Sequence, residues 1–347
     1  MAPIKAPANL PELVKTAFNK ARANGDLNYY ATQVAVLTAN SIPVSLSQTA
    51  VTLSRAAPDT YMQFQLRFSP ALANKPTAPK SQTDQPRKPF DPFENPQNGP
   101  LFIADIPSSG HNLVLNKFAI VPEHFILATK DYKLQTHLLE PSDLAATYAC
   151  IEAYHQHGDN ELYAFFNSGQ HSGASQPHRH IQLLPVARMK DGLPEGSRWD
   201  VLAKQLVQPQ LMGVPFTTFG EKIHGDMAPN ELHAVYVSLF RSAVEAVEAH
   251  VGKLDDSGNG EARISYNLAM TSNSLVVMPR LAEGHTIEEN GRSVGKLSLN
   301  GTVLAGTALV KSEAEWSALK ANSDSNQLVD ILAKIGIPKN SGHSKKL

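Results

Sequence analysis

The sequence has very little cysteine and no long hydrophobic run. Its 347 residues include one cysteine, Cys150, which excludes an intramolecular disulfide framework and a cysteine-rich zinc site. No stretch approaches the ~18 uninterrupted apolar residues of a membrane span. The first residues also lack the continuous apolar core of a secretory signal. These absences predict a soluble, cytoplasmic protein with no membrane partner.

An excess of charge of one sign is also missing. Lys and Arg number 31 and Asp and Glu number 32, which gives a net charge of −1. Nucleic acid is therefore not an expected partner, although a local basic pocket for a small anion is compatible with this balance. The chain has no fixed-period repeat and no break in composition that divides it. We therefore predict a single catalytic domain over residues 1–347.

Hydrophobic periodicity predicts helices and strands in mixed order. The predicted helices cover 11–24 before Gly25, 141–157 and 229–251, and Ser312 and Asn326 begin two short terminal helices. The predicted strands are 62–68, 101–105, 112–121, 125–129, 161–167, 264–271 and 275–278. Hairpin-length connections between strands favour an α+β fold, with an antiparallel sheet flanked by helices.

Residues 69–100 interrupt this pattern with eight prolines in 32 residues. That density excludes a helix or a central strand. Loops of this length in compact domains are usually functional or disordered. Lys75, Lys80, Arg87 and Lys88 make this loop basic. We predict an irregular basic loop here, and a frayed tail over residues 340–347.

The most informative segment is His178-Arg179-His180-Ile181-Gln182. In a strand, alternate side chains share a face, which puts His178, His180 and Gln182 together. The pair of histidines is compatible with an ordinary polar strand, with a shared metal ion or with a nucleophilic imidazole. Gln182 is a poor zinc ligand, so it is better explained beside a nucleophile. We therefore expect no metal held by these residues.

A histidine that attacks phosphorus needs one bare nitrogen, so the other must donate to a fixed acceptor. A nearby main-chain carbonyl on the same strand suits that task, and Gln182 suits a non-bridging phosphate oxygen. Glutamine cannot protonate a poor leaving group. The substrate is therefore expected to have a leaving group that departs readily, as a phosphoanhydride does.

Three polar segments surround this strand in the sequence. The loop Gly173-Ala174-Ser175-Gln176 has the glycine, amides and hydroxyl that cradle an anion, although most such loops are only turns. Asn167 is placed to meet a ribose hydroxyl or phosphate, or simply ends a strand. Asn116 and Lys117 fall inside a predicted strand, so they are expected to face a cleft or an edge.

Two longer stretches, HNLVLNKFAIVPEHFILATKDYKLQ and FFNSGQHSGASQPHRHIQLLPV, resemble the diadenosine tetraphosphate phosphorylases. This family, also called ATP adenylyltransferases, belongs to the galactose-1-phosphate uridylyltransferase-like branch of the histidine-triad superfamily. RFSPALANKP precedes these stretches, and SYNLAMT, VVMPR and LNGTVLAGTALVK follow them. The resemblance covers about residues 60 to 311. The order of NKF, PEH, GASQ and HxHxQ makes it specific, and it implies a histidine-triad-like antiparallel sheet.

The resemblance also implies a two-step phosphorolysis of a dinucleoside polyphosphate to ADP and ATP. His180 would be the nucleophile that becomes adenylylated, His178 would orient it, and Gln182 would bind the phosphate under attack. The implied substrate contacts are Lys75, Asn116, Lys117, Asn167, Gly173, Ala174, Ser175, Gln176, Thr271, Ser272, Asn273 and Met278. Mg²⁺ or Mn²⁺ would be bound with the polyphosphate. The implied partners are the dinucleotide, ATP, ADP and inorganic phosphate, with the chain a monomer or small homo-oligomer.

Three alternatives remain open. One is a dinucleoside polyphosphate hydrolase, in which water is the second nucleophile, and Gln182 in place of a third histidine argues against it. Another is a nucleotidylyltransferase that acts on sugar phosphates. The third is a non-catalytic protein that binds dinucleotides, which the intact HxHxQ pattern disfavours.

Overall fold

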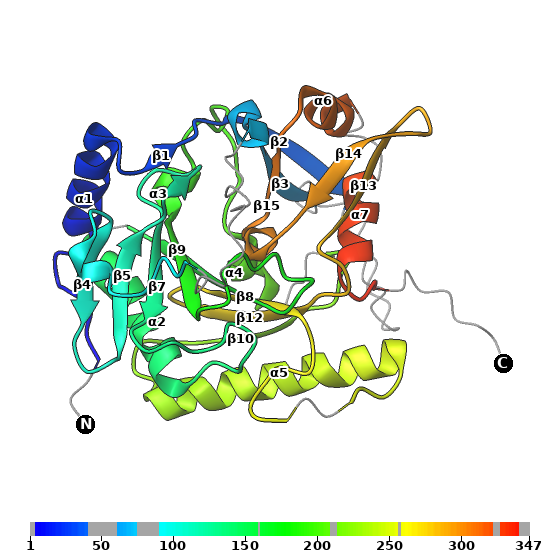
Figure 1. Cartoon of the computed structure of the whole chain (residues 1–347). Helices are drawn as coiled ribbons and strands as arrows, with labels where there is room; N and C mark the ends of the chain where they lie inside the picture. Colours follow the sequence, from blue (N-terminus) through cyan, green and yellow to red (C-terminus); the bar gives the residue numbers. More distant parts are fainter. Residues whose placement is uncertain are drawn as a thin grey trace, which may run out of the picture.

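The computed structural model describes residues 4–40, 61–74, 90–158, 160–208, 214–255, 258–321 and 327–339. At its centre lies an eight-stranded sheet in the order β10-β12-β11-β8-β9-β7-β5-β4, and all neighbouring strands are antiparallel (Figure 1). Its strands are β4 (Phe102–Ile106), β5 (His111–Leu115), β7 (Phe125–Thr129), β8 (Leu162–Ser168), β9 (His180–Pro185), β10 (Phe219–Lys222), β11 (Tyr266–Met270) and β12 (Ser274–Pro279). The predicted α+β fold is confirmed.

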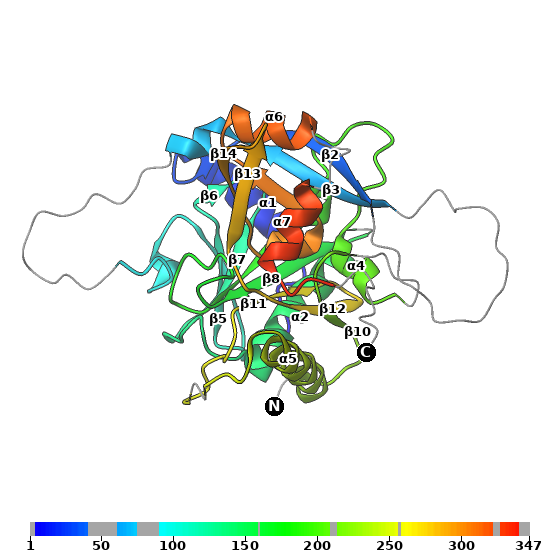
Figure 2. The same ribbon diagram turned by 90° about the vertical axis from the view of Figure 1, so that its right-hand side faces the viewer.

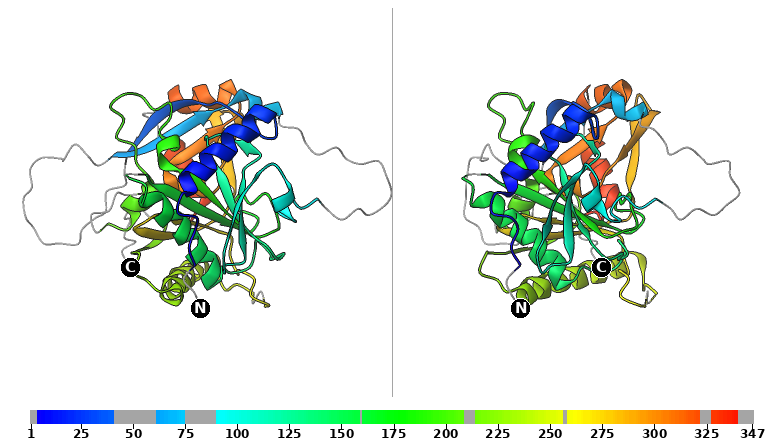
Figure 3. Two further views of the ribbon diagram at one scale, coloured as in Figure 1. Left: turned by 90° about the vertical axis from the view of Figure 1, so that its left-hand side faces the viewer. Right: turned by 60° about the vertical axis from the view of Figure 1, so that its left-hand side comes forward.

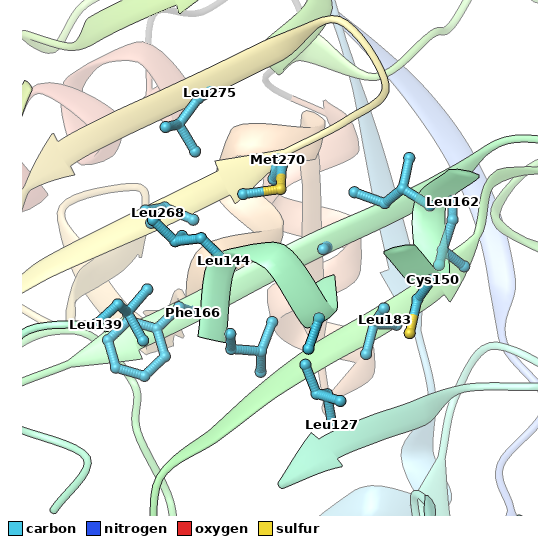
Figure 4. Close-up of a cluster of buried hydrophobic side chains, with 14 of the residues drawn as sticks. Leu127, Leu139, Leu144, Cys150, Leu162, Phe166, Leu183, Leu268, Met270 and Leu275 are labelled. Atoms are coloured by element: carbon cyan, nitrogen blue, oxygen red, sulfur yellow. The ribbon is translucent and has the colours of Figure 1, made fainter. Parts of the chain in front are cut away.

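Long helices cover one face of this sheet. They are α1 (Leu10–Asn24), α2 (Pro141–His155) and α5 (Pro229–Val251). Figure 1 shows α5 beneath the sheet, and Figure 3 shows α1, in blue, beside the strands at the β4 edge. Apolar side chains of the helices and strands meet in one cluster, which includes Leu144 and Cys150 of α2 and Leu183 of β9 (Figure 4). Burial of this apolar surface attaches the helices to the sheet.

Helix starts follow the expected signals. Pro229 occupies the first turn of α5, and the carboxylate of Glu231 accepts a hydrogen bond from the Ala228 N–H at 2.8 Å. The corresponding bond in α2 joins the Asp143 carboxylate to the Glu140 N–H at 2.7 Å. Both are the return half of a capping box, which satisfies a main-chain donor at the helix start.

Smaller elements cover part of the opposite face, on the side away from α5 (Figure 2). They are β2 (Gln33–Asn40), β3 (Tyr61–Phe68), β13 (Gly284–Glu289), β14 (Arg292–Ser298), β15 (Thr307–Val310), α4 (Leu202–Leu206), α6 (Glu313–Ala321), α7 (Gln327–Ile335) and the 3₁₀ turn η3 (Gly301–Ala305). Over β8, β11 and β12 they bury an apolar cluster that includes Phe165, Ala269 and Met278. Over β5 and β7 the same face has a small apolar cluster around Phe93. The predicted site residues His178, His180 and Gln182 lie on this part of the sheet face.

The remaining elements are short. They are β1 (Asn28–Tyr29), paired in parallel with β6 (Phe118–Ala119), the helix α3 (Val186–Met189), and the 3₁₀ turns η1 (Pro70–Asn74) and η2 (Pro96–Asn98). The described parts of the proline-rich segment 69–100 contain only these two turns, as its composition predicts. No helix among the described residues is both long and apolar enough to cross a membrane.

Most predicted elements are confirmed to within a few residues. Gly25 ends α1 with a left-handed φ of 76°. Ser312 precedes α6, and its Oγ accepts the Glu315 N–H at 3.2 Å. Asn326, residues 340–347 and Lys75 lie outside the described residues, and the single domain over the whole chain stays a prediction.

The predicted strand over 112–121 is confirmed over residues 112–115, but it is not continuous. The chain leaves the sheet after Leu115 and re-forms a two-residue strand at Phe118. The Asn116 side-chain oxygen accepts the Phe118 N–H at 2.9 Å, a local bond that competes with the sheet ladder. Asn116 and Lys117 therefore lie at a break between strands and not inside one.

Candidate active site

The histidine strand, residues 178–183, presents its two faces as predicted, although β9 itself begins at His180 and His178 precedes it in an isolated bridge to Leu134. Ile181 and Leu183 point into the cluster beneath the helices. Arg179 points the same way, and its guanidinium donates to the carboxylates of Asp143 at 2.9 Å and Glu140 at 3.0 Å. These three residues anchor the strand from the helix side. His178, His180 and Gln182 are consequently left on the other face.

One nitrogen of the His180 imidazole is held by a main-chain acceptor. Its Nδ1 lies 2.8 Å from the carbonyl oxygen of His178, which can only accept, so Nδ1 carries the proton. Burial lowers the pKa of the His180 imidazole to about 4. At neutral pH its Nε2 therefore has a free lone pair, as a nucleophile requires. The predicted use of a nearby main-chain carbonyl is confirmed.

His178 is held from both sides. Its Nδ1 lies 2.7 Å from Oδ2 of Asp91, and its Nε2 lies 2.9 Å from the Thr129 carbonyl oxygen and 3.0 Å from the Thr129 hydroxyl. The other oxygen of Asp91 accepts the Phe93 N–H at 2.9 Å, which fixes the carboxylate. His178 is therefore immobilised, and so is the carbonyl that orients His180.

Two aromatic rings pack on the histidines. The Phe93 centroid lies 5.1 Å from that of His180 and 5.6 Å from that of His178. Tyr132 lies 5.1 Å from His178 and is 58% exposed. Phe93 is buried and shields the His180 ring from water, which contributes to its lowered pKa.

Gln135 joins the histidine strand to β8. Its side-chain oxygen accepts the His180 N–H at 2.8 Å. Its amide donates to the carbonyl oxygens of Asn167 at 2.8 Å and His180 at 3.1 Å. One buried side chain thus holds the main chain at both predicted site residues.

Asn167 lies beside His180, and the oxygen of its side chain is already used in hydrogen bonds within the protein. Its side-chain oxygen accepts hydrogen bonds from Asn267 and from the Gly301 N–H, both at 2.8 Å. Asn267 is held in turn by the buried guanidinium of Arg280. The amide nitrogen is the end of Asn167 that can serve a ligand.

Another buried histidine, His124, lies near Gln182. The amide nitrogen of Asn116 lies 3.2 Å from Nδ1 and 3.5 Å from Nε2 of His124. Burial, with a smaller contribution from the neighbouring His180, lowers the pKa of His124 to about 4. Asn116 is thus placed near the site through His124.

The segment 173–176 leads directly into the histidine strand. Ala174 and Ser175 are exposed, and Gln176 is half-buried. Gly173 has a φ of +79°, and a Cβ there would lie 2.7 Å from the Cβ of Asn300. Its conformation and this close approach both require glycine. Lys117 is exposed beside the Asn116 turn.

The structure does not bring Thr271, Ser272 and Asn273 to the histidines. β11 starts opposite Asn167 and runs away from it, so that Met270 pairs with Ala164. The turn after β11 therefore lies at the far end of the central strands. The Ser272 carbonyl accepts the Tyr148 hydroxyl there, at 2.8 Å.

Met278 is also absent from the surface near the histidines. It is fully buried in the apolar cluster beneath α7 and η3. The register of β12 with β11 places Met278 opposite Asn267, on the sheet face of the site but under packed side chains. It contributes to packing here.

The residues of the site that were not predicted as site residues include Asp91, Phe93, His124, Thr129, Tyr132 and Gln135. His124 and Gln135 lie inside a stretch that carries the family resemblance, but the sequence alone did not indicate their roles. Asp91 and Phe93 lie within the proline-rich segment 69–100 and have no sequence signal that links them to His178. Among the described residues, no group of three or more His, Cys, Asp or Glu side chains is arranged to hold a metal ion.

Comparisons with known proteins match both halves of the chain. Residues 46–195 match the Ap4A phosphorylase N-terminal domain, and residues 212–338 match the ATP adenylyltransferase C-terminal domain. Diadenosine 5',5'''-P1,P4-tetraphosphate phosphorylase 2 of Saccharomyces cerevisiae is 30% identical over 299 residues, which cover 82% of this chain and 87% of the yeast protein.

Two further yeast comparisons agree. Protein APA1 of Saccharomyces cerevisiae is 26% identical, with 97% of each chain covered. The crystal structure of yeast Ap4A phosphorylase Apa2 in complex with Ap4A is similar with a TM-score of 0.68 and 25% identity, and covers 95% of this chain and 98% of Apa2. The chain therefore belongs to the diadenosine tetraphosphate phosphorylase family.

Proposed function

We propose that the protein catalyses the phosphorolysis of diadenosine tetraphosphate by inorganic phosphate, which yields ADP and ATP. The observation that carries the proposal is the neutral His180 imidazole, whose Nδ1–H is held by the His178 carbonyl so that Nε2 is bare. The activity named for the yeast relative supports this reaction.

In the first step, the lone pair of His180 Nε2 attacks the α-phosphorus. The bond from that phosphorus to its bridging oxygen breaks, and ATP leaves with the electron pair. In the second step, an oxygen of inorganic phosphate attacks the same phosphorus, the P–N bond breaks, and ADP leaves. A covalent adenylyl-histidine divides one difficult displacement into two easier ones.

The surrounding residues have electrostatic and positioning roles in this proposal. Asp91 and Thr129 hold His178, and through it His180. Gln182 binds the phosphate under attack, and residues 173–176, Asn167 and Lys117 contact the rest of the nucleotide. Lys75 and a divalent ion, Mg²⁺ or Mn²⁺, would neutralise the polyphosphate. The nucleotide contacts predicted for Thr271, Ser272, Asn273 and Met278 stay predictions.

We also propose a cellular location and the second substrate. A cytoplasmic location is supported by Cys150, a free and buried thiol. Inorganic phosphate is proposed as the second substrate.

A rapid-quench experiment tests the covalent step. The protein is mixed with diadenosine tetraphosphate and Mg²⁺ without phosphate, quenched, digested and analysed by mass spectrometry for an AMP adduct. We expect the adduct on His180, and we expect His180→Ala to abolish it and turnover while nucleotide binding is retained. His171→Ala, in the neighbouring loop, is the control and should form the adduct. An adduct elsewhere, or turnover by His180→Ala, would remove His180 as the nucleophile.

A further inference from the structure

A buried arginine, Arg280, lies behind the candidate active site. It directly follows β12, is 2% exposed, and takes no part in the proposed reaction steps. Burial lowers the pKa of its guanidinium to about 10, so it keeps its charge at neutral pH. A buried charge is costly unless it is hydrogen-bonded. The guanidinium donates to neutral acceptors, namely the side-chain oxygen of Asn267 and the carbonyl oxygens of Ala282, Glu283 and Leu299.

The direction of the Asn267 amide is fixed at both ends. A guanidinium only donates, so the side-chain oxygen of Asn267 is the end that accepts from Arg280. A main-chain carbonyl oxygen only accepts, and that of Ser172 lies 2.9 Å from the amide nitrogen of Asn267. The nitrogen therefore donates, and its second hydrogen bond, at 2.8 Å, goes to the side-chain oxygen of Asn167.

Asn167 receives a second donor on the same oxygen. The N–H of Gly301 can only donate, and it lies 2.8 Å from the side-chain oxygen of Asn167. Gly301 comes two residues after Leu299, whose carbonyl oxygen accepts from Arg280 at 2.9 Å. Arg280 thus supports both donors, one through Asn267 and one through the main chain before Gly301. The amide nitrogen of Asn167 is the end that remains for a ligand.

Asn167 lies beside the proposed nucleophile. β8 pairs with β9 so that Phe165 is opposite Gln182, and the same register two residues further places Asn167 opposite His180. Opposite residues of an antiparallel pair share a sheet face. Gln135 bridges the strands at this point, because its amide donates to the carbonyl oxygens of both Asn167 and His180. A donor fixed at Asn167 is therefore placed to meet an oxygen of a nucleotide held at His180.

We propose that Arg280 and Asn267 are positioning residues that direct the Asn167 amide, so that its N–H groups and not its oxygen face the nucleotide at His180. This inference rests on the proposed function of the site. Arg280, Asn267 and Asn167 form a directed series of hydrogen bonds, in which each donates to the next and the last donates to the substrate. If the Asn267 donor is lost, the Asn167 amide can turn, and its oxygen would then repel the oxygens of the nucleotide.

Asn267→Asp tests this series with little change of shape. The carboxylate keeps an acceptor for Arg280, but it has no N–H for Asn167 and attracts the Asn167 nitrogen toward itself. We expect KM for diadenosine tetraphosphate to rise by about ten-fold, the value of one hydrogen bond, with kcat within about two-fold of the wild type. General damage to β8 would instead move His180 and lower kcat. An unchanged KM, or a loss confined to kcat, would overturn the proposal.

Asn167→Ala and the double variant with Asn267→Asp complete a double-mutant cycle. Both single changes remove the same substrate contact, so the KM of the double variant should stay close to that of Asn167→Ala. Effects that multiply would overturn the series. Asn160→Asp is the matched control, because it makes the same amide-to-carboxylate change at an exposed side chain. It should leave both KM and kcat unchanged.

A readout on the wild-type protein depends neither on turnover nor on the folding of a variant. In nitrogen-15 NMR, addition of AMP, the part of the substrate that His180 would hold, should shift the side-chain amide signal of Asn167. The Asn267 amide should stay protected from hydrogen exchange. An Asn167 amide that AMP leaves unchanged would overturn the inference, even in an active enzyme. If AMP shifts this amide but diadenosine tetraphosphate is not turned over, the proposed substrate is wrong and the hydrogen-bond series stands.

Discussion

Two histidines of the candidate site are buried. His180 and His124 are 4% and 6% exposed, and burial lowers the pKa of each imidazole to about 4. A protonated imidazole has no lone pair with which to attack phosphorus. Burial therefore keeps His180 reactive at any pH well above this value, without a general base.

The same burial predicts how stability depends on pH. In the unfolded chain a histidine titrates near 6.5, so below that pH the unfolded state binds protons that the folded state excludes. Stability therefore falls as the pH drops from about 6.5 toward 4. Between about pH 7.5 and 5.5, each of the two histidines should lower the free energy of unfolding by about 1 kcal/mol.

Urea denaturation of the wild type and of His180→Asn at these two pH values checks this prediction. The variant lacks one of the two groups, so its loss of stability on acidification should be smaller by about 1 kcal/mol. An identical loss in both proteins would show that His180 is not held neutral by the fold.

At the residue scale, the sequence predicts the groups that are close together along the chain. The strand period places His178, His180 and Gln182 on one face, and the acceptor for His180 is two residues away. Asp91 lies 87 residues from His178, and only the tertiary fold joins them. No periodicity or spacing within one sequence encodes that contact.

At the scale of elements, the loop between β8 and β9 connects the site to the C-terminal half of the chain. Gly173 lies against Asn300, and the neighbouring Gly301 donates its N–H to the side chain of Asn167. A Cβ on Gly301 would lie 2.5 Å from the ring of Phe165, so this approach also needs glycine. Two glycines thus allow the loop and η3 to meet beside His180.

Replacement of Gly173 by alanine should displace this loop. A side chain at a φ of +79° costs about 1–2 kcal/mol, and the contact at 2.7 Å with Asn300 adds to that cost. Gly158→Ala is a matched control, because its φ is +80° but a Cβ there meets nothing within 4 Å. We expect Gly173→Ala to raise KM for the dinucleotide several-fold and Gly158→Ala to leave it unchanged, as measured by steady-state kinetics. Equal KM values for the two variants would show that the conformation of this loop does not affect substrate binding.

Element prediction succeeds where a regular pattern is uninterrupted and fails where a local bond breaks it. α5 is found over the predicted residues because its apolar stripe is continuous. The strand over 112–121 is not continuous because the Asn116 side chain replaces a ladder bond. The hairpin β13–β14 was not predicted, although Asn290 and Gly291 both have positive φ, the signature of a tight hairpin turn.

At the scale of the whole molecule, the two faces of the central sheet have different roles. Its first face is covered by long helices and is largely apolar, with the buried Arg179–Asp143 ion pair as an exception. Its second face is covered by small elements over β8, β11 and β12 and has the polar site over β5, β7 and β9. The sheet takes strands from both regions that match family domains, so the two regions share one hydrogen-bonded framework.

The most direct test of the central claim is a chromatographic product assay with diadenosine tetraphosphate and Mg²⁺, run with and without inorganic phosphate. Phosphorolysis through an adenylyl-histidine predicts ADP and ATP in equal amounts, with sustained turnover only when phosphate is present. Sustained formation of AMP and ATP without phosphate would contradict it and would identify water as the second nucleophile.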